Sequence, residues 1–214
     1  MAFLGNRRSL MTLYSNKVCP WCHRVRVVLA EKGVTPDIVE VDANHIPEDL
    51  LELNPYGTVP TLVDRDLVLY EPNIILEYLE ERFPHPPLMP VYPVSRARSR
   101  LMLLRIDRDW YAPIEKILHG DKYTQDSARK ELSESLLSVA TVFDNSPFFL
   151  SEEYSLVDAA LSALLWRLPM LGIRLEEYPE ARPVIKYGDR MFKRDSFIQS
   201  LSDAEREMRP GYYQ

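Results

Sequence analysis

The stretch Val18–His23 (VCPWCH) decides the fold, because it places a Cys-x-x-Cys pair between a short strand and a helix. Before it, Ser9–Ser15 (SLMTLYS) alternates apolar and polar residues as a strand does. After it, Pro20 suits the first turn of a helix, and Gly33 suits its end. The stretch therefore predicts a strand, a turn that carries two thiols, and a helix.

The rest of the first 83 residues continues this α/β pattern. The sequence predicts a second strand, a short helical piece, a hairpin with a polar turn, and an amphipathic helix. A parallel strand pair joined by a helix and followed by a hairpin is an α/β arrangement. These elements are expected at Asp37–Val41, Pro47–Leu53, Thr58–Val63 with Leu67–Tyr70, and Glu71–Phe83.

The character of the chain changes at Pro84–Pro93 (PHPPLMPVYP), which carries five prolines and cannot be regular helix. After this segment strand signals nearly vanish and helical patterns dominate. We therefore expect an α/β domain at 9–83, a proline-rich linker and surface patch at 84–93, and an all-helical domain at 94–209. The helical patterns lie at Ser95–Leu118, Ser127–Phe143, Leu156–Leu171, Glu180–Lys193 and Asp203–Met208.

The composition narrows the class of protein. The net charge of −6 disfavours direct nucleic-acid binding, which usually needs a basic surface. No apolar run approaches the roughly 20 residues that span a bilayer, and the N-terminus is too poor in apolar residues for a signal peptide. With two cysteines in all, no disulfide framework is expected, so we predict a cytoplasmic protein without membrane association.

Three features of the first domain resemble the thioredoxin-like domain of glutathione transferases. These are the Cys-Pro-Trp-Cys turn after a strand, Thr58-Val59-Pro60 ahead of a strand, and a helix that begins at Glu71. The all-helical second half fits the second domain of that family, and Ser155-Leu-Val-Asp158 reads as its capping box. The resemblance implies that Pro60 is cis.

A narrower resemblance covers essentially the whole chain. The segments RSLMTLYS, VPTLVDRDLVLYE, EERFPHPPLMPVYPV and LVDAALSALLWRLPMLGI are similar to the stringent starvation protein A family, and the proline-rich run is the most specific. These bacterial proteins of glutathione-transferase fold associate with RNA polymerase and regulate transcription. The resemblance therefore implies RNA polymerase holoenzyme as the partner and protein–protein contact as the mode of action.

The cysteine pair allows an enzymatic alternative. Cys19 would sit at a helix N-terminus, which favours the thiolate, and Cys22 could resolve a mixed disulfide one turn on. CPWC resembles the active site of glutaredoxins and of cysteine-type transferases, so the alternative function is a glutathione-dependent thiol transferase that uses Cys19. A regulator whose affinity for polymerase changes when the pair is oxidised stays open as well. A zinc site is not expected, because a second group of ligands is missing.

The positions that would hold glutathione argue against that enzyme. Transferases of this fold bind the γ-glutamyl end with a Glu/Gln-Ser pair, and the matching residues here are Glu71 and Pro72. Pro72 has neither the hydroxyl nor the backbone N–H. Each lost charge-assisted bond costs on the order of 1.5–3 kcal/mol. We therefore interpret Val59, Pro60, Glu71 and Pro72 as a vestigial glutathione site, and expect no catalytic residue, no metal and no cofactor.

The proline-rich segment has two interpretations. It can be a connector whose prolines fix the angle between two domains. It can also be a binding surface, because proline-rich backbone loses little entropy on docking and tyrosine is frequent at binding hot spots. In the resembled family this Pro-His-Pro region and its tyrosine form an exposed patch needed for transcriptional activity. The resemblance thus assigns partner binding to Pro84, His85, Pro86 and Tyr92.

Further features have structural interpretations. The arginines of Arg96–Arg108 are expected to form a solvated face paired with nearby acids. Trp110, Tyr111 and the helix around Trp166 are expected in the core. Folds of this type commonly pair, so we expect a homodimer, and the helix that carries Glu77 and Tyr78 is a candidate for its interface.

Overall fold

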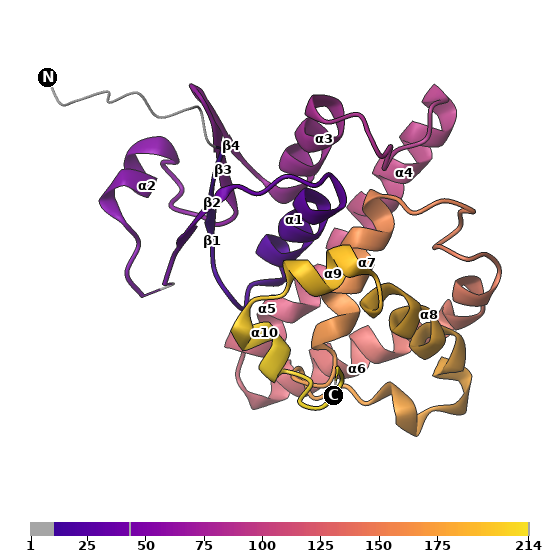
Figure 1. Cartoon of the computed structure of the whole chain (residues 1–214). Coiled ribbons are helices and arrows are strands. Elements are labelled where there is room, and N and C mark those ends of the chain that lie inside the picture. Colours follow the sequence, from indigo (N-terminus) through magenta and orange to yellow (C-terminus); the bar gives the residue numbers. More distant parts are fainter. Residues whose placement is uncertain (1–10, 43, 214) are drawn as a thin grey trace, which may run out of the picture.

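The computed structural model describes residues 11–42 and 44–213 of the chain. Its first half is a four-stranded mixed sheet with three helices. The strands lie in the order β2-β1-β3-β4 (Figure 1). β1 pairs with β2 in parallel, and the pairs β1–β3 and β3–β4 are antiparallel. The elements are β1 (Thr12–Ser15), α1 (Pro20–Glu31), β2 (Asp37–Glu40), α2 (Glu48–Leu53), β3 (Thr61–Asp64), β4 (Leu67–Tyr70) and α3 (Pro72–Arg82).

The predicted order of strands and helices is confirmed in this half. Gly33 ends α1 with a φ of 64°, and Arg65 takes a φ of 60° in the polar turn between β3 and β4. The strand predicted at Ser9–Ser15 occurs as β1, which begins at Thr12. Ser9 and Leu10 lie outside the described residues. The two faces of the sheet are covered differently: α1 and α3 lie between the sheet and the second half, while α2 packs on the other face (Figure 1).

The second half is helical in the described part of the chain, with an isolated bridge between Phe148 and Ser151 as its β-type pairing. Its α-helices are joined by π and 3-10 turns and by short loops. They are α4 (Pro93–Ile106), α5 (Ala112–His119), α6 (Lys122–Ser138), α7 (Leu156–Arg167), α8 (Arg182–Phe192), α9 (Asp195–Ser200) and α10 (Asp203–Glu207). None of the described helices is long and apolar enough to cross a membrane.

The helical pattern predicted over Ser95–Leu118 is confirmed, but the helix is not regular. The chain forms α4, then a π-helical turn at Asp107–Tyr111, then α5. Pro113 explains the interruption, because its missing N–H and its ring disturb the α-helical ladder one turn earlier. In the widened turn the N–H of Ala112 donates to the carbonyl of Asp107, five residues back.

Other helix ends also differ from the predicted bounds. The helix expected to reach Leu171 ends at Arg167, since Pro169 cannot continue it. The helix expected from Ser127 begins at Lys122, because the Asp121 carboxylate caps it by accepting the Thr124 N–H at 2.8 Å. The last helices, expected at Glu180–Lys193 and Asp203–Met208, occur as α8 and α10, and α9 between them had no prediction.

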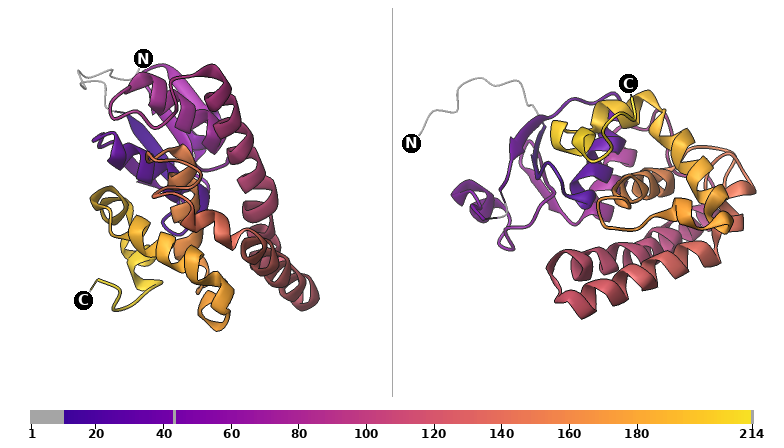
Figure 2. Two further views of the ribbon diagram at one scale, coloured as in Figure 1. Left: turned by 90° about the vertical axis from the view of Figure 1, so that its right-hand side faces the viewer. Right: turned by 90° about the horizontal axis from the view of Figure 1, so that it is seen from below.

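The two halves share one hydrophobic core around α7. This helix is buried along its length, as its apolar sequence predicts, and its start carries the predicted capping box. Asp158 accepts from the Ser155 N–H at 2.9 Å and from the Tyr187 hydroxyl at 2.7 Å. The chain then returns toward the first half, where α9 packs against α1 (Figure 2). Trp110, Tyr111 and Trp166 are buried, as predicted.

Candidate functional site

A cleft of about 560 Å³ opens between the first half and α5. It brings together five of the residues singled out from the sequence. Cys19 stands at the start of α1, Val59 and Pro60 precede β3, and Glu71 and Pro72 begin α3. Its remaining lining residues are Asn16, Val18, Pro20, Trp21, Val41, Ile46, Gly57, Thr58, Glu115, Leu118 and His119.

Cys19 is the N-cap of α1, and its thiol is partly exposed. Its Sγ accepts the backbone N–H of Cys22 at 3.4 Å. Hydrogen bonding from the Cys22 side chain, helped by that N–H and by the positive Arg167, lowers the pKa of Cys19 from 9.0 to about 7 against the opposing effect of burial. The lowered pKa favours the thiolate form of Cys19, which is the nucleophilic form of cysteine.

Cys22 is fully buried and does not line the cleft. Its Sγ accepts the N–H of Asn16 at 3.4 Å, and burial raises its pKa well above the ordinary value. Both cysteines are free thiols. The structure thus separates the pair into one reactive thiol and one shielded thiol. In the described residues no three His, Cys, Asp or Glu side chains group to hold a metal ion.

The Val59–Pro60 peptide bond is cis, as the resemblance implied. Asn54, which the sequence reasoning missed, fixes this turn: its buried amide donates to the Thr58 carbonyl at 3.2 Å and to the Thr61 hydroxyl at 3.0 Å. An Asn that ends a helix just before Pro55 was the available signal.

Glu71 adopts a φ of 73°, a left-handed conformation that is uncommon outside glycine. Its carbonyl accepts the N–H groups of Ile74 and Ile75 at 3.0 and 3.1 Å, which starts α3, and its side chain makes no capping bond. Pro72 supplies neither an N–H nor a hydroxyl to the cleft. None of the residues that line the cleft is Lys or Arg. The cleft therefore offers no lysine or arginine, and no donor at position 72, to the two carboxylates of glutathione.

The proline-rich segment between α3 and α4 has an exposed side. Pro84, His85 and Pro86 are exposed, and the His85–Pro86 bond is cis. Tyr92 is 76% exposed and neighbours Val91 at 83%. We call Pro84, His85, Pro86 and Tyr92 the proline patch. It follows the C-terminal end of α3, whereas the cleft lies at the N-terminal end of that helix.

The same segment also has a buried side. Leu88 and Met89 are 2% and 5% exposed, and their N–H groups donate to the Glu80 carboxylate at 3.0 and 3.2 Å. The Lys32 ammonium, at the end of α1, binds both Glu80 and the Pro86 carbonyl at 2.6 Å. This ion pair was missed from the sequence because its members lie 48 positions apart.

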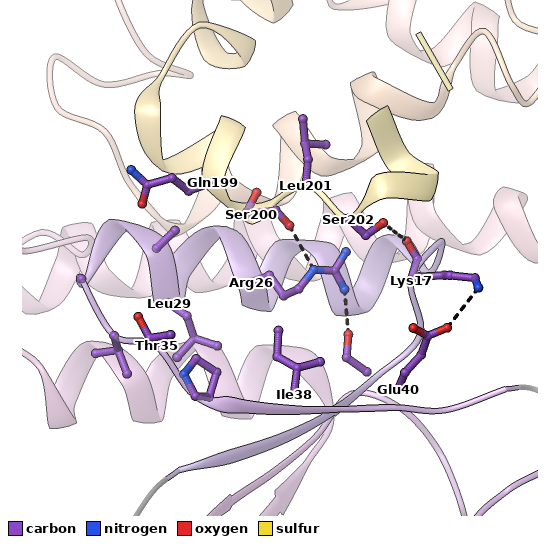
Figure 3. Close-up of a pocket in the computed structure, with 15 residues that line it drawn as sticks. Lys17, Arg26, Leu29, Thr35, Ile38, Glu40, Gln199, Ser200, Leu201 and Ser202 are labelled. Carbon is purple, nitrogen blue, oxygen red and sulfur yellow. Dashed lines mark hydrogen bonds and ion pairs between the residues drawn. The ribbon is translucent and has the colours of Figure 1, made fainter. Parts of the chain in front are cut away.

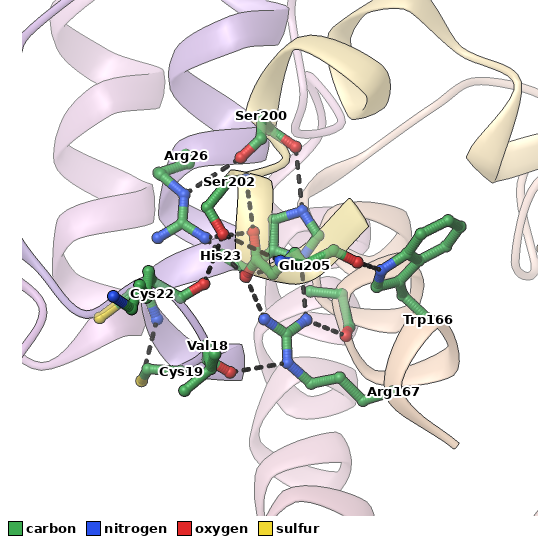
Figure 4. A network of polar contacts seen from close by, with 12 residues as sticks. Val18, Cys19, Cys22, His23, Arg26, Trp166, Arg167, Ser200, Ser202 and Glu205 are labelled. Atoms are coloured by element: carbon green, nitrogen blue, oxygen red, sulfur yellow. Dashed lines mark hydrogen bonds and ion pairs between the residues drawn. The ribbon is translucent and has the colours of Figure 1, made fainter. Parts of the chain in front are cut away.

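A second buried ionic group joins the first half to the C-terminus (Figure 4). Glu205 of α10 accepts two bonds from the Arg26 guanidinium at 2.6 Å and a further bond from Arg167 of α7. Arg167 also donates to the Val18 carbonyl at 3.1 Å, and the Ser202 hydroxyl donates to the Lys17 carbonyl at 2.6 Å. The loop that leads to Cys19 is thereby held by the C-terminal helices.

His23 belongs to this group. Arg167 donates to its Nδ1 at 2.8 Å, so Nε2 carries the proton and donates to the Ser200 hydroxyl at 3.0 Å. Burial, with the nearby Arg167 and Arg26 charges, lowers the pKa of His23 well below its usual value. His23 is therefore neutral and structural. Arginines inside apolar helices were the signal for such a group, but the partner was not readable from the sequence.

A second cavity of about 400 Å³ lies beside Arg26, between β2, α1 and the connection from α9 to α10 (Figure 3). The buried Arg26 guanidinium already donates hydrogen bonds to the Ser200 carbonyl, the Ser15 hydroxyl and the Glu205 carboxylate. At the rim, Lys17 pairs with Glu40 at 3.1 Å. This cavity therefore offers no free charge to a ligand.

The arginines of α4 are partly paired, as predicted. Arg100 binds Glu77 of α3 at 2.8 Å, and Arg105 lies 3.8 Å from Asp109. Tyr78 donates its hydroxyl to Asp64 at 2.7 Å. These contacts make the α3–α4 face a mixed surface of ion pairs and exposed apolar side chains.

Both halves of the chain match glutathione S-transferase domains. Residues 18–82 match the glutathione S-transferase N-terminal domain, and residues 94–195 match the glutathione S-transferase C-terminal domain. A solved glutathione transferase from Methylococcus capsulatus is 27% identical, with a TM-score of 0.81 over 92% of this chain and 98% of that one. The predicted fold, a thioredoxin-like domain followed by a helical domain, is confirmed.

Two full-length relatives are much closer in sequence. The stringent starvation protein A homolog of Haemophilus influenzae is 52% identical over 95% of this chain and 96% of its own. That of Coxiella burnetii is 50% identical over 95% of this chain and 97% of its own. The resemblance seen in the proline-rich run thus extends over almost the whole length.

Proposed function

Because the chain belongs to the stringent starvation protein A family, we propose that it is a transcription regulator that binds RNA polymerase holoenzyme. It acts in the cytoplasm, by protein–protein contact through the proline patch and without glutathione transferase activity. The observation that carries the proposal is a segment whose buried side is fixed while its apolar outer side, Tyr92 above all, is exposed.

The anchoring supports this role energetically. Lys32 and Glu80 hold the backbone from Pro86 to Met89, so the patch loses little conformational freedom when a partner docks. Tyr92 presents a rigid amphipathic ring, the kind of side chain that dominates many interfaces. The net charge of −6 opposes direct DNA binding, so in this proposal the regulator does not itself recognise a DNA sequence.

The test is co-purification of polymerase holoenzyme from a cell lysate with the tagged chain. His85→Ala and Tyr92→Ala should each recover about tenfold less polymerase than the parent, while their unfolding midpoints stay unchanged because both side chains are exposed. Tyr123→Ala is the matched control, since Tyr123 of α6 is 84% exposed and lies outside the patch. Equal recovery by all four proteins would show that the patch assignment is wrong.

We also propose a homodimer formed through the α3–α4 face. Ile74, Leu101 and Leu104 are 54%, 58% and 41% exposed there, which is unusual for side chains of this size on adjoining helices. Sedimentation should give twice the chain mass of 24.9 kDa. Leu101→Asp should shift the species to one chain mass; a parent that sediments as a single chain contradicts the dimer.

The second candidate function is a glutathione-dependent thiol transferase. The observation that favours it is the lowered pKa of Cys19 in an open cleft, with Cys22 one turn on. The donor set of the cleft opposes it. The discriminating assay is reduction of hydroxyethyl disulfide with glutathione. The regulator proposal predicts no turnover above the uncatalysed rate, whereas the enzyme requires turnover that disappears in Cys19→Ser.

A redox-sensing regulator is a variant of the first proposal. In it, oxidation of Cys19 and Cys22 to a disulfide would change the affinity for polymerase. Comparing co-purification by the oxidised and reduced chain decides this, and equal recovery removes the variant.

A further inference from the structure

The charged side chains that line the cleft are mostly negative. They are the carboxylates of Glu71 and Glu115, with His119 placed 3.6 Å from Glu115. No lysine or arginine lines the cleft. Cys19 also lines the cleft, and its lowered pKa favours the negatively charged thiolate. In a fold whose cleft would be expected to hold an anionic tripeptide, the charged side chains that line it are therefore mostly negative.

Glu71 is the carboxylate best placed for a ligand. Among the described residues its side chain forms no hydrogen bond or ion pair, and it is exposed. Its backbone is fixed by the left-handed turn and by the two N–H groups at the start of α3. The carboxylate thus has an unused acceptor capacity at a defined wall of the cleft, next to a proline that cannot compete for it.

The other walls of the cleft are largely apolar. Trp21 is held edge-on against Tyr111 at 5.5 Å between ring centroids. Leu118 and Ile46 are 45% and 42% exposed, and Val59 is half-buried. A volume of about 560 Å³ suits a small ligand or one extended side chain. Apolar walls that lead to a free carboxylate match an alkyl stem that ends in a cation.

We propose that this cleft binds an alkylammonium or alkylguanidinium group, with Glu71 as its counter-ion, in place of glutathione. The cation pairs with Glu71 and its stem packs against Trp21 and Leu118. Such a group comes from a polyamine or from a lysine or arginine of a peptide. The site is separate from the proline patch, because the 11 residues of α3 place the two at ends about 16 Å apart.

The test is calorimetric titration of the full chain with three probes. These are reduced glutathione, spermidine, and a blocked acetyl-Leu-Arg-Leu-amide, with its norleucine analogue as the neutral control. We expect saturable binding of at least one cationic probe, weaker binding of glutathione, and none of the norleucine peptide. Binding of spermidine alone identifies a polyamine as the source, and binding of the peptide alone identifies a basic side chain.

The variant Glu71→Gln should weaken binding of the cationic probe about tenfold or more, since a hydrogen bond to a charged group contributes about 1.5–3 kcal/mol. Glu81→Gln is the matched control on α3, because Glu81 is exposed and does not line the cleft. Three results overturn the proposal: glutathione binds more tightly than both cations, neither cation binds, or the two variants weaken the cation equally. None of these outcomes changes the polymerase co-purification, so the two proposals fail independently.

Discussion

The two sides of the proline-rich segment show how one stretch of chain serves as both connector and surface. On the inner side, Leu88 and Met89 are buried and their N–H groups are taken by Glu80. On the outer side, Val91 and Tyr92 are 83% and 76% exposed. The linker interpretation therefore concerns the buried residues of this segment, and the proposed binding surface concerns the exposed ones.

The same contrast recurs at the start of α1. His23 has both ring nitrogens bonded inside the protein, whereas Cys19, four residues earlier, lines an open cleft with a lowered pKa. Groups whose bonds are completed internally stabilise the fold, and groups left open are available to partners. We expect substitution of an internally bonded residue to lower stability, and substitution of an open residue to change binding or reactivity.

The largest expected effect is on the anchor of the inner side. Glu80→Ala leaves the Lys32 ammonium buried without a counter-ion and frees two backbone N–H groups. We expect the free energy of unfolding to fall by about 3–5 kcal/mol in urea denaturation. Glu81→Ala, one residue on and exposed, should change it by less than about 0.5 kcal/mol. Similar losses of unfolding free energy in both variants would contradict the role of Glu80 as the anchor of the inner side.

The next effect separates the two sides directly. Leu88→Ala removes a buried side chain and should cost about 2–5 kcal/mol of unfolding free energy. Val91→Ala should leave stability within about 0.5 kcal/mol and instead reduce the recovery of polymerase, because Val91 is exposed directly beside Tyr92 of the proline patch. Thermal unfolding and co-purification measured on both variants check this. A stability loss in Val91→Ala would place that residue on the inner side.

A smaller effect concerns His23 and depends on pH. Because its folded pKa is depressed, the unfolded chain binds the extra proton, so stability falls as the pH drops below about 6.5. The parent should lose up to about 1.4 kcal/mol per pH unit more than His23→Gln between pH 6.5 and 5. Urea denaturation over this range measures the difference. His45→Gln, on an exposed histidine, should follow the parent.

The smallest effect is a change of rate without a change of stability. Alkylation of Cys19 by iodoacetamide should reach half of its maximal rate near pH 7, because its pKa is lowered from 9.0 to about 7. Cys22 should stay unmodified in the folded chain, since it is fully buried. Mass spectrometry of the labelled peptides separates the two sites. A midpoint near pH 9 would remove the activation of Cys19.

The sequence predicted features that depend on local patterns. The order of strands and helices along the chain, the end of α1 at Gly33 and the Ser155–Asp158 box all follow from residues close together in the chain. Pro60 was assigned as cis from the family resemblance. A regular α-helix is interrupted where one residue overrides the pattern, as Pro113 does by forcing a π turn.

The sequence could not predict the ionic anchors, because their members are distant in the chain. Lys32 and Glu80 lie 48 positions apart, and Arg26 and Glu205 lie 179 apart. Charged residues on apolar helix faces signal that a partner exists, but only the folded chain identifies it. Within the cleft, the sequence identified the residues individually, whereas the negative charge of the whole lining required the structure.

Hydroxyl-radical footprinting of the chain, free and in complex with RNA polymerase holoenzyme, tests the central claim without any substitution. Tyr92 and Tyr123 are 76% and 84% exposed, so both should be oxidised at comparable rates in the free chain. In the complex we predict that oxidation of Tyr92 falls several-fold while that of Tyr123 is unchanged. Undiminished oxidation of Tyr92 in a complex shown to be saturated would contradict the assignment of the proline patch as the polymerase-binding surface.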